Sequence, residues 1–447
     1  MCTLTTLILV VFVVGYALIA CENLTKVNKA AIALLMCVVC WTLYMLHPAA
    51  HVPGLTPDQV PVRVNAAIET HLGSVSTTLF FLMGAMTIVE VVNQYGGFNF
   101  VSHALRTCSK RKLLWRVVVV TFFLSAILDN MTTTIVMIMV LRKLVSDHND
   151  RIIYASLVIL AANAGGAFSP IGDVTTVMLW NMSLITASGV IKELLLPSII
   201  SIIIPTVLLQ YKLRGTLGET TSTAPSATAD ALQEWQRRVV FVLGVGGLIF
   251  VPFFRYLTNL PPFVGILLVL AVLWVATELM YCYSRQAQPV ESRSKRVAQL
   301  LGRIDMSTIL FFLGILMTVA CLQELGVLTT VGQALDRAFY GNHYLVTGLI
   351  GVLSSVVDNV PLVAGCIGMY PLQCMGAFAV DGIFWQLLAY CAGVGGSLFI
   401  IGSAAGVVAM GLEKISFGWY ARHITWAAFA GYLGGMVSYY LLRTLVF

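Results

Sequence analysis

Apolar runs of about the length that crosses a lipid bilayer recur from one end of the chain to the other. Residues 6–20, 30–46 and 239–254 are three examples, and a helix needs about 20 apolar residues to span the hydrocarbon layer. Of the 447 residues, 59% are hydrophobic and 10% are charged, whereas soluble domains carry about 25% charged residues. The pattern predicts an all-α polytopic membrane protein surrounded by lipid. Since no stretch is long and polar enough for a soluble catalytic domain, we expect no enzyme.

The first apolar run is interpreted as a retained membrane helix. It lacks the basic residues that open a signal peptide, and a plastid protein would usually carry a transit extension that this sequence does not show. We therefore expect a multi-pass protein of the bacterial inner membrane. The net charge of +6 comes from Lys and Arg in loops, so we expect no nucleic-acid partner. Cys37 and Cys40 lack a second Cys or His pair that would complete a metal site, and no cofactor is expected.

Basic clusters predict which loops face the cytoplasm. Residues 106–116 and 141–151 are both rich in Lys and Arg, so the chain between them has to leave the cytoplasm and return to it. Two complete spans would need about 40 residues, which is more than residues 113–142 supply. We therefore predict a re-entrant helical hairpin at about 113–142, with Asp129 and Asn130 at its tip inside the membrane. Such irregular backbone is tolerated only where protein or water surrounds it.

The same pattern returns almost half a chain later. Asp358 and Asn359 stand near the centre of residues 344–369, which predicts a second hairpin. Each hairpin is followed by an apolar segment that clustered Gly and Ser residues interrupt, and one Gly weakens a helix by roughly 1 kcal/mol. We predict broken helices at about 152–187 and about 383–412. Freed carbonyls and half-helix ends at such breaks commonly bind ions and substrates in transporters.

The two halves of the chain align with each other. Residues 76–90 match residues 307–321, and counting the crossings between them gives the two matched helices opposite directions. The predicted organisation is therefore a first inverted repeat at 1–214, a cytoplasmic linker at 215–236 and a second inverted repeat at 237–447. Inverted repeats with paired broken helices are typical of an alternating-access transporter with its site near the membrane midplane.

Four motifs in order carry a resemblance to a known family. They are "LDNMTTT" (128–134), "NAGGAFSPIGDVTTVMLWN" (163–181), "VVDNVPL" (356–362) and "GGSLFIIGSAAGVVAMG" (395–411). With them the whole chain resembles the NhaD-type sodium/proton antiporters of the ion transporter superfamily. The resemblance implies a scaffold domain that forms a homodimer and a transport domain that moves in an elevator mechanism. It also implies exchange of Na⁺, and of Li⁺ with it, for H⁺ in pH homeostasis.

Acidic side chains inside apolar segments are the candidate ion ligands. An ionised carboxylate near the bilayer centre costs several kcal/mol unless it is paired or functional. Nearly every Lys and Arg falls in a loop or at a helix end, so we expect no basic side chain to neutralise these acids. The predicted ion- and proton-binding residues are Asp129, Asn130, Thr132, Asn163, Asp173, Thr175, Thr176, Asp358, Asn359, Ser397 and Ser403, with Glu90 as a further proton-linked candidate.

Within this set we expect Na⁺ at Asp129, Asp173, Asn130 and Asn163, because hard cations prefer oxygen ligands. A setting of low polarity and a nearby like charge both favour a protonated carboxyl. A site that holds either Na⁺ or protons, but not both, exchanges one for the other by competition. Asp358 and its neighbouring Asn would complete this site or form a second one.

Some of these residues have a purely structural alternative. The threonines at 132–134 can simply bond neighbouring helices, and Glu90 lies about one turn from a helix end, where it can reach the interface. His47, His51 and His71 are expected on an outer loop as solvated side chains.

Other functions compete with cation exchange. A sodium-coupled carboxylate or other anion carrier of the same fold would use the acids for Na⁺ alone and would need positive groups for its anion. An intramembrane aspartyl protease would need a Gly-x-Gly-Asp signature, and residues 170–173 read "PIGD". The internal repeat has no role in such a protease, and it also disfavours a simple channel.

Overall fold

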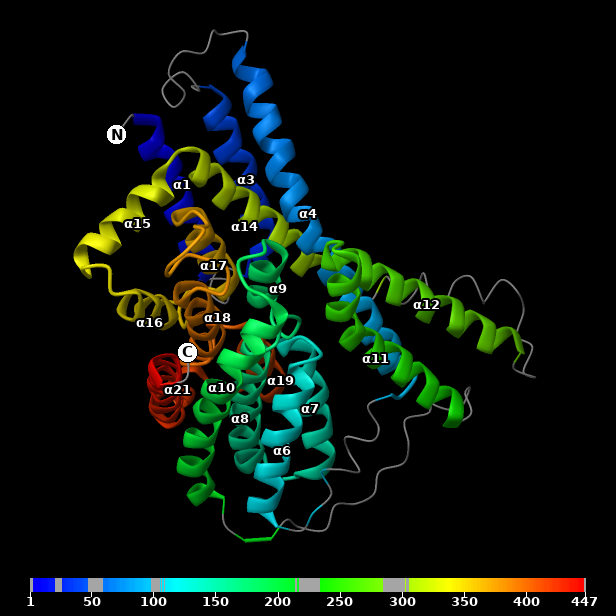
Figure 1. Cartoon of the computed structure of the whole chain (residues 1–447). Coiled ribbons are helices and arrows are strands. Elements are labelled where there is room, and N and C mark those ends of the chain that lie inside the picture. Colours follow the sequence, from blue (N-terminus) through cyan, green and yellow to red (C-terminus); the bar gives the residue numbers. More distant parts are fainter. Residues whose placement is uncertain are drawn as a thin grey trace.

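The protein is almost entirely helical in the part that the computed structural model describes (Figure 1). The one β-type contact among these residues is an isolated bridge between Ser109 and Thr216. Most of the predicted linker lies outside them, as do His47 and His51. The described residues are 3–20, 26–46, 59–97, 105, 107, 109–213, 215–216, 234–283, 302 and 305–445.

Six of the described helices are long and apolar enough to cross a membrane. Large apolar side chains such as Leu35 and Phe253 are exposed on their outer faces, which is where a helix that is apolar all round meets lipid. The six helices are α3 (Lys29–Leu46), α4 (Gln59–Gln94), α10 (Ala187–Leu209, extended by the 3-10 turn Gln210–Lys212), α11 (Glu234–Thr258), α12 (Pro262–Tyr283) and α14 (Met306–Glu324).

Two helical hairpins have arms too short to cross the membrane singly. The first consists of α6 (Lys110–Ser125) and α7 (Asn130–Leu144). The second consists of α16 (His343–Leu353) and α17 (Asn359–Met369). In both, the turn places an Asp-Asn pair where the second arm begins.

Two broken helices accompany the hairpins. The first is α8 (His148–Ala167) followed by α9 (Val174–Asn181), and the second is α18 (Ile383–Gly395) followed by α19 (Ala404–Glu413). Contacts between the two halves join them, since α18 and α19 both pack against α8, and α18 also packs against α9. The breaks of the two halves therefore lie close together.

Glycines at the breaks let each hairpin approach its own broken helix closely. A Cβ on Gly165 would collide with the backbone carbonyl of Phe122 in the first hairpin. A Cβ on Gly395 would collide with the backbone carbonyl of Gly351 in the second hairpin. Because a backbone carbonyl cannot move aside as a side chain can, only glycine permits this approach.

A serine at the end of each hairpin's first arm makes the same contact in both halves. Ser125 Oγ donates to the carbonyl of Ala162 at 2.7 Å, and Ser354 Oγ donates to the carbonyl of Ala392 at 2.8 Å. The two halves thus repeat one local packing of hairpin on broken helix.

The remaining helices, apart from α15, complete two groups (Figure 1). We call α1, α3, α4, α11, α12 and α14 the frame, and α6 to α10 with α16 to α21 the hairpin body. In the frame, α3 packs on α1 and α14, and α12 packs on α4 and α11. In the hairpin body, α10 packs along α21. The helices not yet bounded are α1 (Thr3–Ala20), α15 (Val327–Ala338), α20 (Phe417–His423) and α21 (Thr425–Leu445).

A buried ion-pair cluster holds the basic end of the first hairpin. Glu413, at the end of α19, is buried and accepts hydrogen bonds from Arg142 Nε and Arg151 Nε, each at 2.7 Å. Its second oxygen lies 3.7 Å from His148 Nδ1. The cluster ties α7 and α8 of the first half to α19 of the second, on the side of the predicted cytoplasmic loops.

Candidate functional site

Asp129 lies at the tip of the first hairpin as the N-cap residue of α7. Its carboxylate accepts from the backbone N–H of Thr132 at 2.8 Å and from the Thr132 hydroxyl at 2.5 Å. The cap satisfies a free N–H of the helix and places a negative charge at the positive end of the helix dipole. Thr132 therefore holds the orientation of this carboxylate.

Three amide and hydroxyl side chains link the first hairpin to both breaks. Asn130 Nδ2 donates to Asn163 Oδ1 at 3.0 Å, and Asn163 Nδ2 donates to Ser403 Oγ at 2.9 Å. All three side chains are buried. Ser403 caps α19 by accepting from the N–H of Gly406 at 3.3 Å. The chain of contacts crosses from the first half to the second.

Asp173 lies where α9 begins after the first break, and only 2% of its surface is exposed. Its carboxylate accepts from Asn359 Nδ2, at the tip of the second hairpin, at 3.1 Å. Unlike Asp129, it makes no side-chain hydrogen bond that caps its own helix. Among the residues that the structure describes, neither Asp129 nor Asp173 forms an ion pair with a basic side chain. Both carboxylates therefore keep oxygens available for a cation or a proton.

The threonines after Asp173 are fully buried beside it. Thr176 Oγ1 donates to the backbone carbonyl of Asp173 at 2.8 Å. Thr175 Oγ1 is buried and lies close enough to the Asp173 carboxylate to interact with it. The Thr175 hydroxyl therefore adds a neutral oxygen next to a buried carboxylate.

Asp358 caps α17 at the tip of the second hairpin, and here the structure corrects an expectation. The expectation that no basic side chain would neutralise an acid in the site is wrong for this residue, because Lys29 Nζ lies 3.5 Å from Asp358 Oδ2. Lys29 is the first residue of α3, so along the sequence it looks like an ordinary helix-end lysine. Only the packing of α3 on α14, and of α14 against α17, brings its charge to the site.

Two predicted residues stand apart from this cluster. Ser397 Oγ donates to the carbonyl of Val394 in its own chain segment at 2.6 Å, a local bond of the kind Ser often makes. Glu90 lies half-buried on α4 and does not line the cavity beside Asp129.

A cavity of about 60 Å³ lies between the two acids and the frame. Asp129, Asn130 and Asp173 line it together with apolar side chains from α4, α11 and α14. A space of this size holds a few water molecules or a partly hydrated ion. Among the described residues no Lys, Arg or His lines it, so its polar character there is acidic and neutral.

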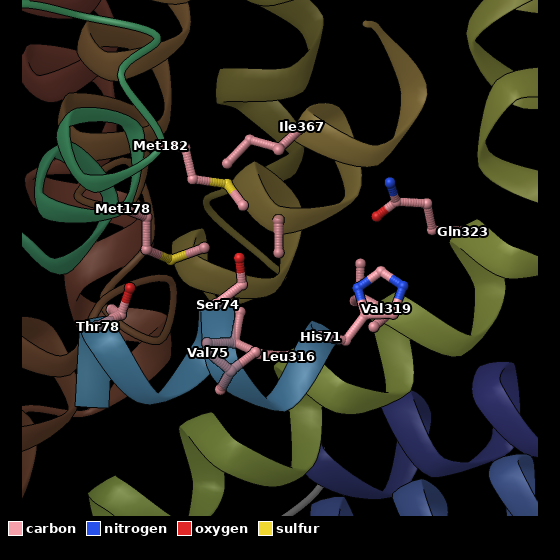
Figure 2. Close-up of a pocket in the computed structure, with 12 residues that line it drawn as sticks. His71, Ser74, Val75, Thr78, Met178, Met182, Leu316, Val319, Gln323 and Ile367 are labelled. Carbon is pink, nitrogen blue, oxygen red and sulfur yellow. The ribbon is translucent and has the colours of Figure 1, made fainter. Parts of the chain in front are cut away.

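A second cavity of about 70 Å³ lies farther toward the start of α4 (Figure 2). Met178 and Met182 from the hairpin body and His71 from α4 line it. The expectation that His71 is a solvated loop residue is wrong, because it lies within α4 and its Nε2 is 2.9 Å from Glu324 Oε1. Residues of one helix, α4, thus line both the cavity at the site and a second cavity nearer the start of that helix.

Comparison with known proteins agrees with this architecture. A family model described as "Citrate transporter" matches residues 16–388. Sodium/proton antiporters 1 and 2 of Arabidopsis thaliana are 42% and 40% identical to this chain, covering 98% and 96% of it and 72% and 97% of those proteins. The Na(+)/H(+) antiporter NhaD of Vibrio cholerae is 28% identical over 97% of this chain and 91% of that protein.

A solved structure supports the fold. The crystal structure of the Alcanivorax borkumensis YdaH transporter, described as having an unusual topology, superposes with a TM-score of 0.63 at 15% identity. The match covers 94% of this chain and 98% of that one.

The fold and the buried acids define an integral, multi-pass membrane transporter, and its relatives are named as transporters and antiporters rather than enzymes. The chain belongs to the family whose model is described as the citrate transporter, CitMHS. The predicted all-α polytopic fold and the resemblance to NhaD-type antiporters are confirmed. A bacterial inner-membrane location agrees with the NhaD relatives from bacteria.

Proposed function

We propose that this protein exchanges Na⁺, and Li⁺ with it, for H⁺ across the membrane. The observation that carries the proposal is Asp173. Its carboxylate is almost completely buried, has no basic partner among the described residues and shares a small cavity with Asp129. A buried charge of this kind is costly unless it binds something.

Competition between the ions accounts for the exchange. Two carboxylates facing one small cavity repel each other when both are ionised, so a cation or a proton between them is favourable. The Asn130 and Asn163 side chains and the Thr175 hydroxyl supply neutral groups beside them. Na⁺ and H⁺ therefore exclude each other at Asp129 and Asp173, and exchange follows without a cofactor.

The citrate description of the family model supports a second candidate, a carrier of carboxylate anions. A citrate site needs positive groups, whereas the cavity at Asp129 is lined by acids and neutral side chains. The relatives with 42% and 40% identity are named for sodium and protons. These observations favour cation exchange over carboxylate transport, and citrate is included as a test substrate in the experiment below.

The proposed movement follows from the two groups of helices. We propose that the frame forms a homodimer and stays fixed, while the hairpin body carries the site across the membrane as an elevator. The repeats at 1–214 and 237–447 supply one hairpin and one broken helix each to the moving part. The second cavity, nearer the start of α4, supports access to the site from one face in this conformation.

The test is proton movement in proteoliposomes. The purified protein is reconstituted with a pH-sensitive dye inside and an acidic interior, and Na⁺, Li⁺, K⁺, citrate or succinate is added outside from neutral to alkaline pH. We expect Na⁺ and Li⁺ alone to raise the internal pH. Asp173→Asn removes the buried charge and should abolish the response, whereas Asp147→Asn, at the exposed N-cap of α8, should keep it because Asn caps a helix about as well as Asp.

Two outcomes would count against the proposal. Uptake of citrate or succinate without a proton response to Na⁺ alone would make the acids a coupling site for an anion carrier. An undiminished Na⁺ response in a folded Asp173→Asn protein would remove Asp173 from the exchange.

A further inference from the structure

The second hairpin tip is held by a cation that belongs to the protein itself. Lys29 Nζ lies 3.5 Å from Asp358 Oδ2 and 4.5 Å from the ring centre of Phe311. The side chains of Lys29 and Asp358 are 27% and 19% exposed, so water only partly screens the pair. Lys29 and Phe311 belong to the frame, whereas Asp358 belongs to the hairpin body.

The surroundings of Asp358 make it part of the ion site. Its neighbour Asn359 donates to Asp173, and Asp358 lies within electrostatic range of that carboxylate. Its own helix supplies a weak cap, from Val360 N–H at 3.4 Å. From α1 the Tyr16 hydroxyl, buried without a hydrogen-bond partner among the described residues, also lies within electrostatic range. The frame thus presents an ammonium and a hydroxyl to this tip.

The two hairpin tips differ in what neutralises their acids. Asp129 receives a hydroxyl and a backbone N–H from Thr132, which leave its charge in place. Asp358 receives a full positive charge from Lys29. The position of Thr132 in the first tip corresponds to Pro361 in the second, which has neither donor. One tip is therefore open to an external cation, and the other is filled by a tethered one.

We propose that Lys29 is a positioning residue that occupies Asp358 in place of a transported cation in this conformation, so that a cation reaches Asp358 only when Lys29 leaves it. This inference rests on the proposed cation exchange. Since Lys29 is carried by the frame, displacement of the hairpin body separates the pair. Asp129 and Asp173 then receive the ion in this state, and Asp358 becomes available after the movement.

The first experiment compares Lys29→Met with Lys29→Arg and with Lys26→Met, an exposed lysine just before the same helix. Proton movement is measured against Na⁺ concentration. A partly exposed ion pair contributes up to about 1 kcal/mol, which corresponds to about a fivefold change in affinity. We expect Lys29→Met to lower the half-saturating Na⁺ concentration about fivefold and to slow maximal turnover. Lys29→Arg and Lys26→Met should behave like the parent protein.

A double variant tests whether Lys29 acts through Asp358. In the background of Asp358→Asn there is no charge for the ammonium to neutralise, so Lys29→Met should have no further effect on the half-saturating Na⁺ concentration. If Lys29 acted only by stabilising the fold, Lys29→Met would still change the half-saturating Na⁺ concentration in this background. Equal shifts with and without the Asp358 carboxylate would overturn the proposal.

A second measurement needs no variant. The reactivity of the Lys29 amine toward an acylating reagent is followed by mass spectrometry in Na⁺ and in choline. We expect Na⁺ to raise the labelling of Lys29 and to leave Lys26 unchanged, because cation binding releases the ammonium. Labelling that ignores Na⁺ in a protein that does exchange Na⁺ for protons would overturn the Lys29 proposal alone. Absence of any Na⁺-driven proton movement would instead refute the proposed function.

Discussion

Three acidic side chains in one region illustrate how much their immediate contacts decide. Asp129 is oriented by Thr132, Asp173 is buried against the amide of Asn359, and Asp358 faces Lys29. An uncharged hydroxyl or amide leaves the negative charge for an ion, whereas a lysine cancels it. Residues of the same type therefore have three different electrostatic roles.

Asn163 is one of the residues whose side chains join the two halves, and its removal has a defined consequence. In Asn163→Ala the buried side chains of Asn130 and Ser403 each lose a partner, which typically costs about 1–3 kcal/mol. We expect a lower thermal midpoint and a higher half-saturating Na⁺ concentration. Both are measured on purified protein, by intrinsic fluorescence and in proteoliposomes.

The control is on the same helix. Ser156 is also buried on α8, but its hydroxyl donates only to the carbonyl of Ile152 in its own helix. Ser156→Ala should leave both quantities nearly unchanged. Equal thermal midpoints and equal half-saturating Na⁺ concentrations in the two variants would show that the Asn163 contacts contribute little to stability or ion binding.

At the scale of elements, the decisive feature is how closely a hairpin approaches a broken helix. The serine contact and the glycine contact recur in both halves between residues at corresponding positions of hairpin and broken helix. Each tip is therefore positioned by its own broken helix, and the acids at the tips reach a common region because the two broken helices pack against each other.

Gly165→Ala tests this packing. The new Cβ would press on the backbone carbonyl of Phe122, and overpacking of this kind costs about 1–3 kcal/mol. We expect a lower thermal midpoint and reduced exchange, and the same for Gly395→Ala in the second half. The measurements are thermal unfolding and proton movement.

Gly246→Ala is the matched control within a membrane helix. Nothing lies within 4 Å of the Cβ that would be added there, and Ala is favoured over Gly in a helix by about 0.5–1 kcal/mol. This variant should be as stable as the parent or more so. A loss of stability as large as that of Gly165→Ala would refute the packing argument.

For the whole molecule, polar contacts between described residues join the frame to the hairpin body. Arg255 on α11 lies over the ring of Trp180 and donates to its carbonyl at 2.6 Å and to Ser183 Oγ at 3.0 Å. Lys29 pairs with Asp358. Under the proposed elevator movement these contacts have to break and reform in each cycle.

Cross-linking the two groups of helices tests that movement. Asn181 Nδ2 on α9 donates to Thr78 Oγ1 on α4 at 3.3 Å, so Thr78→Cys combined with Asn181→Cys places two thiols within reach of a short bifunctional reagent. We expect cross-linking to stop exchange and a cleavable linker to restore it after cleavage. Each single variant treated with the same reagent is the control for the native cysteines. Full exchange by the cross-linked protein would contradict the elevator.

Much of the architecture could be predicted because membrane insertion leaves a strong signal in the sequence. Apolar length, the basic loops and interrupted segments predict helices, hairpins and breaks, since backbone groups inside lipid have to be satisfied within helices. The repeated Asp-Asn pairs indicated the tips of the hairpins. These features are local, so composition and spacing are enough to find them.

The arrangement of the site was decided by the tertiary structure alone. Lys29 is far in sequence from Asp358, and Asn163 is far from Ser403, so no local pattern announces either contact. Ser397 stands in a motif predicted to bind ions, but its hydroxyl donates to the nearby carbonyl of Val394. The sequence determined that acids and oxygens lie inside the membrane, because their cost there depends on type and depth. Which of them face each other, and which one meets a lysine, depends on how helices from both halves pack against one another.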